Sequence, residues 1–146
     1  MSGDVVLKGA ENEAARAEGT ARLWQKLIDN GENLVVILDT PFLGVDIPDC
    51  LLENLGAPQE CSASYEQAVL DAPRPDLKAA ELVNGVETVD LSESFCPKRQ
   101  RCFAYLRDMV VFRDSHHMTG AFAASLEGDL EAQLRQSAAL AERMPG

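Results

Sequence analysis

Apolar residues recur every three or four positions in some stretches and form short continuous runs in others, which separates predicted helices from predicted strands. Residues 11–30 have the helical spacing, with Thr20 placed as an N-cap and Gly31 as a C-terminal glycine. The apolar face of this predicted helix consists of Leu23, Trp24, Leu27 and Ile28.

The most regular spacing lies near the C-terminus and predicts one long amphipathic helix over about residues 119–143, with Thr119 as its N-cap. A helix with a single apolar stripe packs against another element, here a sheet. The stripe consists of Met118, Phe122, Leu126, Leu130 and Leu134.

Continuous or alternating apolar runs predict the strands. Residues 34–38 form a β-branched run that suits a strand covered on both faces, and residues 5–7 form a shorter run of the same kind. Residues 85–91 alternate as a third strand does, and residues 103–112 are rich in β-formers, with a turn near Arg107. A helix between two such strands is the unit of a parallel sheet.

The remaining stretches are less regular. Residues 42–61 are rich in Pro, Gly and Asp and predict a long loop, and residues 62–82 predict two short helices separated by a proline-containing break. The sequence therefore predicts one α/β domain over residues 1–146, with a mostly parallel sheet flanked by helices.

Charge narrows the range of partners. Lys and Arg number 13 against 24 Asp and Glu, for a formal net charge of −11, which disfavours binding to nucleic acid or to anionic membranes. No apolar run approaches the roughly 18–20 residues that span a bilayer, and residues 1–4 have no basic region of a secretory signal. We expect a cytoplasmic chain, or a piece of a larger protein whose targeting lies elsewhere.

The cysteines form two local pairs, Cys50 with Cys61 and Cys96 with Cys102, both in predicted loops. These pairings need the least loop closure among the possible connectivities, so two disulfides are favoured. Free buried thiols are an alternative, and structural zinc is another, although neither pair has the usual short spacing of zinc ligands. No metal or cofactor is expected. Disulfides would indicate an oxidising, extracytoplasmic compartment.

The two histidines of the chain, His116 and His117, are adjacent, between a predicted strand and a predicted helix. Active-site residues of open α/β sheets gather at such strand ends. Asp114 lies three residues before His117, so in a turn its carboxylate can reach the imidazole, fix the tautomer and leave the other nitrogen as a general base. The alternative is a polar turn in which Asp114 or Thr119 caps the helix and both histidines are solvated.

Four segments occur in a distinctive order: residues 47–51 (I-P-D-C-L), 89–91 (V-D-L), 96–102 (C-P-K-R-Q-R-C) and 114–119 (D-S-H-H-M-T). Together with the upstream strands they resemble the C-terminal part of the SGNH domain of acyltransferase family 3 proteins, which are membrane-bound O-acyltransferases. The resemblance covers most of the chain. It implies an SGNH-hydrolase-like, flavodoxin-like fold.

The resemblance also implies roles for individual residues. His117 would be the catalytic general base and Asp114 its orienting carboxylate, whereas His116 would not be catalytic. The family's nucleophile is a serine in a Gly-Asp-Ser segment after the first strand, and no such segment occurs in this sequence. Asn12 is the candidate for the oxyanion-hole asparagine. We therefore expect a partial SGNH domain that lacks the first strand and is inactive alone.

Three functional hypotheses follow. The first is half of an acyl-ester transferase or hydrolase site that O-acylates, usually O-acetylates, a cell-surface polysaccharide or glycan. Its partners would be an acyl donor, a glycan acceptor and an upstream membrane acyltransferase domain in the same chain, on the extracytoplasmic side. The second is a non-catalytic, degenerate SGNH domain that binds glycan or a partner protein. The third is a cytosolic hydrolase with reduced cysteines.

Overall fold

The computed structural model describes residues 2–138 and residue 140. Helices and short strands are mixed along the chain, in agreement with the predicted α/β class. The chain forms two compact units: unit 1 comprises Met1–Asp39, Pro73–Val89 and Gln133–Gly146, and unit 2 comprises Thr40–Ala72 and Asp90–Ala132. Within the described residues, no helix combines the length and apolar composition needed to cross a membrane.

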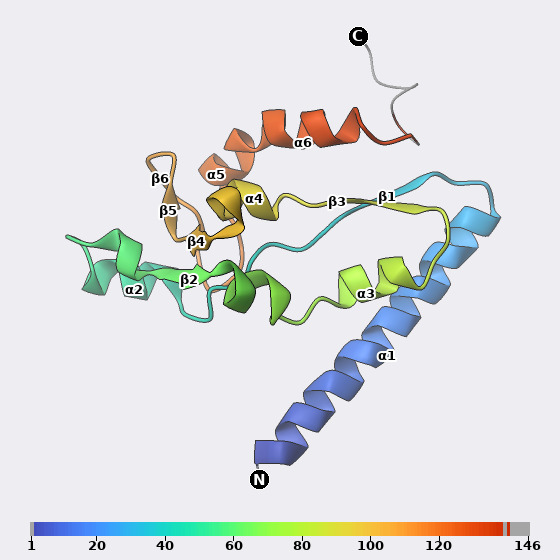
Figure 1. Cartoon of the computed structure of the whole chain (residues 1–146), viewed down its shortest axis with the longest axis horizontal. Coiled ribbons are helices and arrows are strands. Elements are labelled where there is room, and N and C mark those ends of the chain that lie inside the picture. Colours follow the sequence, from blue (N-terminus) through green and yellow to red (C-terminus); the bar gives the residue numbers. More distant parts are fainter. Residues whose placement is uncertain (1, 139, 141–146) are drawn as a thin grey trace. The chain divides into compact units, whose positions relative to one another are not determined.

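Unit 1 is built on two helices, α1 (Ser2–Asp29) and α3 (Pro75–Glu81), which lie against each other (Figure 1). Small side chains at their contact allow the close approach of the two helices. The buried cluster between them contains Ala17, Ala21, Ala79 and Val83, and the partly buried Trp24, Ile28 and Val86 pack against it.

The sheet of unit 1 consists of β1 (Leu34–Ile37) and β3 (Val86–Val89), which pair in parallel. The strands predicted over residues 34–38 and 85–91 are thus confirmed. The prediction that the first of them is covered on both faces is wrong, because Ile37 is 53% exposed in this two-stranded sheet.

The two ends of α1 bear on three predictions. The helix ends as predicted at Gly31, which has φ +86°, and its terminal bonds run from Gly31 N to Ile28 O and from Glu32 N to Leu27 O. The start differs: residues 5–7 are helical rather than a strand, and Thr20 lies inside the helix rather than at its N-cap. The surrounding Ala, Glu and Lys residues are strong helix formers, so the helix continues through the short apolar run.

In unit 2, the predicted loop over residues 42–61 contains α2 (Ile47–Glu53) and a short 3₁₀ turn, η1 (Pro58–Glu60). The helix forms because Asp46 caps it, accepting a hydrogen bond from Asp49 N at 3.1 Å, and because Pro48 occupies its first turn. Residues 62–82 begin in unit 2 with a strand, β2 (Ser62–Ser64), and a π-helical turn, η2 (Glu66–Leu70). They end with α3, which belongs to unit 1.

The rest of unit 2 starts with α4 (Ser92–Phe95), η3 (Pro97–Arg99) and β4 (Arg101–Phe103), which pairs antiparallel with β2. A hairpin of β5 (Tyr105–Leu106) and β6 (Met109–Val110) follows. Its turn lies where the sequence predicts it, with φ +52° at Arg107 and +57° at Asp108. Because two of the three strand pairs are antiparallel, the predicted mostly parallel sheet is not what these strands form.

The predicted C-terminal helix is divided into α5 (Gly120–Ser125) and α6 (Glu127–Leu134). The break falls at Leu126, whose backbone N–H bonds Ala123 O in a tighter 3₁₀-like turn. Helix α6 ends at Leu134, so the expectation of one helix to about residue 143 is wrong as far as the described residues extend. Residues 139 and 141–143 of that prediction lie outside the described residues.

Both disulfides favoured from the sequence are present. Cys50 and Cys61 have a Cα–Cα separation of 5.9 Å, and Cys96 and Cys102 one of 4.0 Å. Unit 2 also contains a buried aromatic cluster: Phe95 lies 5.8 Å from Phe112 and 5.1 Å from Phe122 between ring centroids, and all three are at most 1% exposed.

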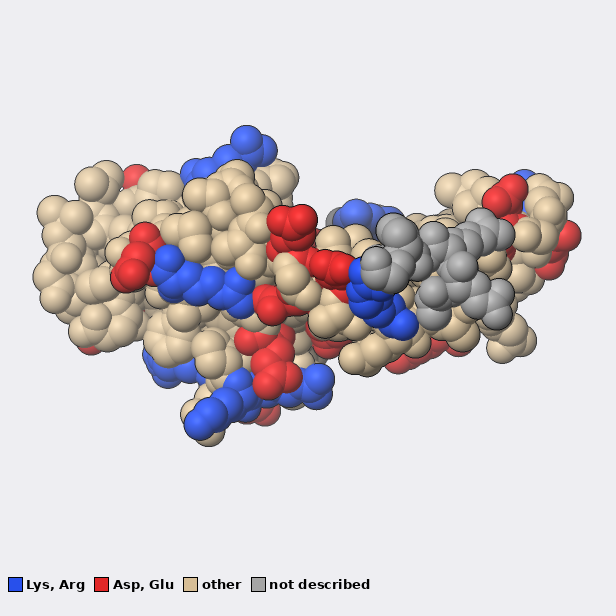
Figure 2. Space-filling model, turned by 90° about the horizontal axis from the view of Figure 1, so that it is seen from above, with Lys and Arg blue, Asp and Glu red and all other residues tan. Residues whose placement is uncertain are grey.

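Charged side chains of both signs occupy the surface. On the face drawn in Figure 2, acidic and basic groups are interspersed with other residues in small groups. In unit 2, the partly exposed side chains of Arg107 and Asp129 lie 2.6 Å apart. The side-chain hydrogen bond from Arg107 lowers the pKa of Asp129 below its usual value.

Candidate active site

The segment that carries the histidines is a short loop with both ends fixed in the core of unit 2. Phe112 and Met118 pair across the loop as an isolated antiparallel bridge, and Arg113 N donates to His117 O at 2.8 Å. Phe112 precedes the loop and Phe122 follows it, and both rings are fully buried. These anchors restrict the loop backbone while its side chains face outward.

The helix that follows the loop starts where the sequence predicts. Thr119 Oγ1 accepts a hydrogen bond from Phe122 N at 3.2 Å and donates to Val110 O at 2.7 Å. The N-cap of α5 is therefore Thr119 and not Asp114. This leaves the Asp114 carboxylate for contacts inside the loop.

Asp114 organises the loop through three contacts. Its Oδ1 accepts hydrogen bonds from the backbone N–H groups of His116 at 2.9 Å and His117 at 2.7 Å, and its Oδ2 lies 2.7 Å from His117 Nδ1. The two backbone donors, together with the His117 ring, hold the pKa of Asp114 well below its usual value. Asp114 is therefore a carboxylate over the whole physiological pH range.

The Asp114–His117 contact has a defined chemical consequence. With a proton on Nδ1, the ring donates to the carboxylate, and Nε2 is left as an acceptor that can remove a proton from another group. The carboxylate also stabilises the imidazolium that this transfer creates. The His117 side chain is 53% exposed, so a substrate can reach it.

Besides the hydrogen bond from its backbone N–H to Asp114, His116 has partners that His117 does not share. Its Nδ1 lies 2.8 Å from Ser115 Oγ, and its carbonyl oxygen accepts a hydrogen bond from Thr40 Oγ1 at 3.2 Å. Thr40 is a site residue that sequence reasoning missed, because it appears there only as the end of a strand. The His116 ring lies beside that of His117, with centroids 4.0 Å apart and planes inclined at 40°.

The structure does not place all the predicted site residues in one unit. Asp114 and His117 are in contact in unit 2, whereas Asn12 is an exposed residue of α1 in unit 1. Its assignment to an oxyanion hole stays a prediction. The four cysteines are in unit 2, where both disulfides lie on the framework that carries the loop.

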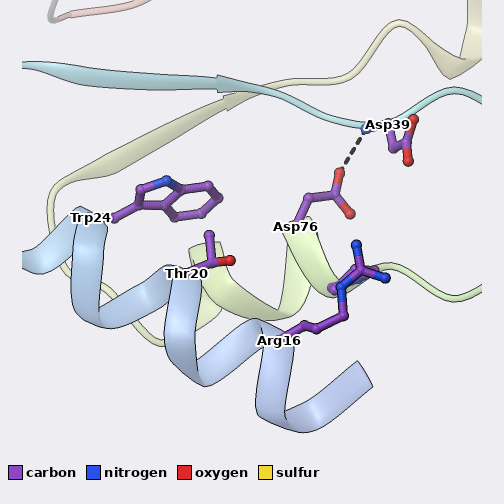
Figure 3. Close-up of a pocket in the computed structure, with 6 residues that line it drawn as sticks. Arg16, Thr20, Trp24, Asp39 and Asp76 are labelled. Carbon is purple, nitrogen blue, oxygen red and sulfur yellow. Dashed lines mark hydrogen bonds between the residues drawn. The ribbon is translucent and has the colours of Figure 1, made fainter. Parts of the chain in front are cut away.

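Unit 1 contains a separate pocket of about 190 Å³. Arg16, Thr20 and Trp24 line it from successive turns of α1, and Asp76 faces them from α3 (Figure 3). Asp39 N donates to Asp76 Oδ2 at 2.7 Å, and Pro75 completes the lining. The pocket thus combines an indole ring with carboxylate, guanidinium and hydroxyl groups.

The Asp114–His117 pair thus lies on a loop between a short strand and a helix of an α/β chain. Residues 2–132 match the family model described as "SGNH domain (fused to AT3 domains)", and the chain belongs to this family. No curated protein matched the chain, and no solved structure did.

Proposed function

We propose that the chain contributes the aspartate and histidine of a Ser-His-Asp site in an SGNH-type acyltransferase. The observation that carries the proposal is the 2.7 Å contact between Asp114 Oδ2 and His117 Nδ1, on an exposed loop of a chain of this family. The serine would come from a Gly-Asp-Ser segment in an upstream part of the same protein, because this sequence has none.

In the complete site, the serine Oγ attacks the carbonyl carbon of an acyl donor while its proton passes to His117 Nε2. The carbonyl electron pair becomes the oxyanion, which backbone amides would stabilise. Collapse of this intermediate breaks the bond to the leaving group, which takes the proton from His117. An acceptor hydroxyl then attacks the acyl-serine and passes its own proton to His117. The bond between the acyl carbon and the serine Oγ breaks, and Oγ takes that proton from His117, which regenerates the serine.

The family match supports a proposal for the substrate and the location. Because the family's SGNH domains are fused to AT3 domains, we infer that a membrane acyltransferase domain continues the chain and delivers the acyl group. Acetyl transfer to a hydroxyl of a cell-surface polysaccharide or glycan fits this arrangement. The two disulfides support an extracytoplasmic position, since such bonds persist in oxidising compartments.

The test is acyl transfer by the complete acyltransferase in which this domain occurs. We expect His117→Ala to reduce transfer at least about 10³-fold, because the general base is lost, and His116→Ala to retain most of it. Full activity of His117→Ala would overturn the proposal, and loss of activity only in His116→Ala would reverse the two roles.

The isolated 146-residue chain provides a second test. Without a serine nucleophile in its motif, it should hydrolyse short acyl esters no faster than buffer does. Ser115→Ala is the informative variant, since the Ser115 hydroxyl forms a hydrogen bond with Nδ1 of the neighbouring His116 ring. Turnover by the chain that disappears in Ser115→Ala would show that the chain carries its own nucleophile.

A second candidate function is glycan binding without catalysis, and the pocket of unit 1 favours it. A sugar ring can stack its apolar face on the Trp24 indole while its hydroxyls bond Asp76 and Arg16, which line the same pocket. Trp24 is the single tryptophan of the chain, so all tryptophan fluorescence comes from a residue that lines this pocket.

Titration of the chain with neutral monosaccharides and short oligosaccharides tests this second candidate. A saturable fluorescence change should weaken at least about tenfold in Arg16→Gln and persist in Glu18→Gln, an exposed α1 residue outside the lining. A change that is equal in both variants would exclude the pocket as the binding site.

A further inference from the structure

The loop contains one imidazole more than an acid–base pair needs. Side chains of consecutive residues usually diverge, yet the His116 and His117 rings lie side by side with centroids 4.0 Å apart. The cause is Asp114, whose Oδ1 binds both backbone N–H groups and so turns both residues around one carboxylate. The result is two nitrogen donors beside one oxygen donor.

These three side chains bring atoms of the kind that bind metal ions close together. One carboxylate oxygen of Asp114 and one ring nitrogen from each of His116 and His117 all lie within 4.8 Å of one another. Zinc forms bonds of about 2.0–2.2 Å to nitrogen and oxygen, so its tetrahedral ligands are separated by about 3.4 Å. The side chains of His116, His117 and Asp114 are 57%, 53% and 40% exposed, so they have room to rotate. Modest rotations can bring the ligand atoms from their present separations to those that zinc requires.

We propose that Asp114, His116 and His117 bind Zn²⁺ or a similar divalent transition-metal ion, and that this binding switches the acyl-transfer site off. Two imidazole nitrogens and one carboxylate favour zinc over magnesium or calcium, which prefer all-oxygen sites. Water can complete the coordination, because the loop is open to solvent. The inhibitory part rests on the proposed function, since the ion would occupy the nitrogen or oxygen that the catalytic pair uses.

The binding part is tested on the chain itself. We would titrate ZnCl₂ into chelator-treated protein by calorimetry in 150 mM salt, with MgCl₂ in a parallel titration. We expect one zinc site per chain and no comparable magnesium binding. His116→Asn should weaken zinc binding at least about tenfold, with its fold checked by circular dichroism.

The chain offers a matched control for its high negative charge. Asp114→Asn and Asp108→Asn remove the same charge, but Asp108 lies in the β5–β6 turn outside the ligand set. Asparagine tolerates the positive φ of that turn. We expect Asp114→Asn to weaken zinc binding about tenfold or more and Asp108→Asn to leave it unchanged. Equal weakening in both, or wild-type affinity in His116→Asn, would overturn the site.

The regulatory part is measured in the complete acyltransferase, as the rate with zinc divided by the zinc-free rate of the same variant. Zinc should inhibit the wild-type enzyme, and His116→Asn should need at least about tenfold more zinc for the same inhibition. Zinc binding to the chain without inhibition would overturn regulation. If His117→Ala left transfer intact, the proposed function would fail, while calorimetry would still decide the metal site.

Discussion

Unit 2 is cross-linked and filled with aromatic rings, whereas unit 1 is held by small side chains and polar contacts. All four cysteines and the buried cluster of Phe95, Phe112 and Phe122 belong to unit 2. In unit 1, α1 and α3 pack through alanines, and Glu13 accepts a hydrogen bond from Arg74 N at 2.7 Å and pairs with Lys78 at 3.3 Å.

Buried polar atoms reinforce the contrast. Among the described residues, the buried side-chain atoms without a hydrogen bond are Arg74 Nε and Nη2, Asp76 Oδ1 and Ser137 Oγ, all in unit 1. Arg74 Nε lies 3.6 Å from Asp76 Oδ1, an ionic contact but a long one. Such atoms cost free energy when buried, so we expect unit 1 to open more easily than unit 2. On this expectation, the histidine loop lies in the unit that opens less easily.

The largest expected effect is in the aromatic core. Phe122→Ala should lower the free energy of unfolding by about 3–5 kcal/mol, because it leaves a cavity beside Phe95. Leu23→Ala in α1, where the side chain is 58% exposed, is the control and should change it by less than about 0.5 kcal/mol. Denaturant unfolding measures both, and equal losses would remove the basis of the contrast.

The next effect concerns the cross-links. Replacing Cys50 and Cys61 by alanine should destabilise the fold by roughly 2–3 kcal/mol, because the bond closes a loop across a sequence separation of 11 residues. Hydrogen exchange should accelerate in β2 and β4 and stay unchanged in β1 and β3. If hydrogen exchange accelerated equally in all four strands, the two units would have to be treated as one cooperative folding unit.

Unit 1 should be sensitive to added volume instead. Ala79 is fully buried between α3 and α1, so Ala79→Leu should cost about 1–3 kcal/mol through overpacking. Glu81→Leu, at an exposed position of the same helix, is the matched control. Exchange should accelerate in α1 and α3 of the Ala79 variant alone; an unaltered rate there would mean that the alanine contact does not hold unit 1.

The smallest effect is electrostatic and depends on pH. The Arg107 hydrogen bond lowers the pKa of Asp129 in the folded state, so its stabilisation is present above the unfolded-state pKa of about 3.9 and is lost as the pH falls through the folded-state value. Both side chains are more than a third exposed, so the gain is below about 1 kcal/mol. In Arg107→Gln, NMR titration should show the Asp129 pKa returning toward its usual value, and an unchanged pKa would refute the assigned cause.

Local features of the fold could be predicted from the sequence. The Thr119 cap, the Gly31 terminus, the turn at Arg107 and the two disulfides each depend on residues close together in the chain. The wrong predictions involve competition between neighbours or distant contacts. Residues 5–7 look like a strand until the helix formers beside them are weighed, and the break at Leu126 is invisible in an apolar stripe that continues through it.

The contacts of the candidate site also differ in whether the sequence could predict them. The spacing of Asp114 and His117 predicts their contact, which the structure contains. The Thr40 bond to His116 joins residues 76 positions apart and leaves no local signal in the sequence. The close placement of the two rings could not be predicted either, because it depends on how Asp114 binds both backbone N–H groups.

The central claim is that Asp114 holds His117 with Nε2 available as a base. The most direct measurement is the imidazole ¹⁵N NMR spectrum of the chelator-treated chain, which contains only two histidines. The account predicts that neutral His117 carries its proton on Nδ1 and that Asp114→Asn shifts this tautomer balance while Asp108→Asn does not. A His117 ring protonated on Nε2, or one that does not respond to Asp114→Asn, would contradict it.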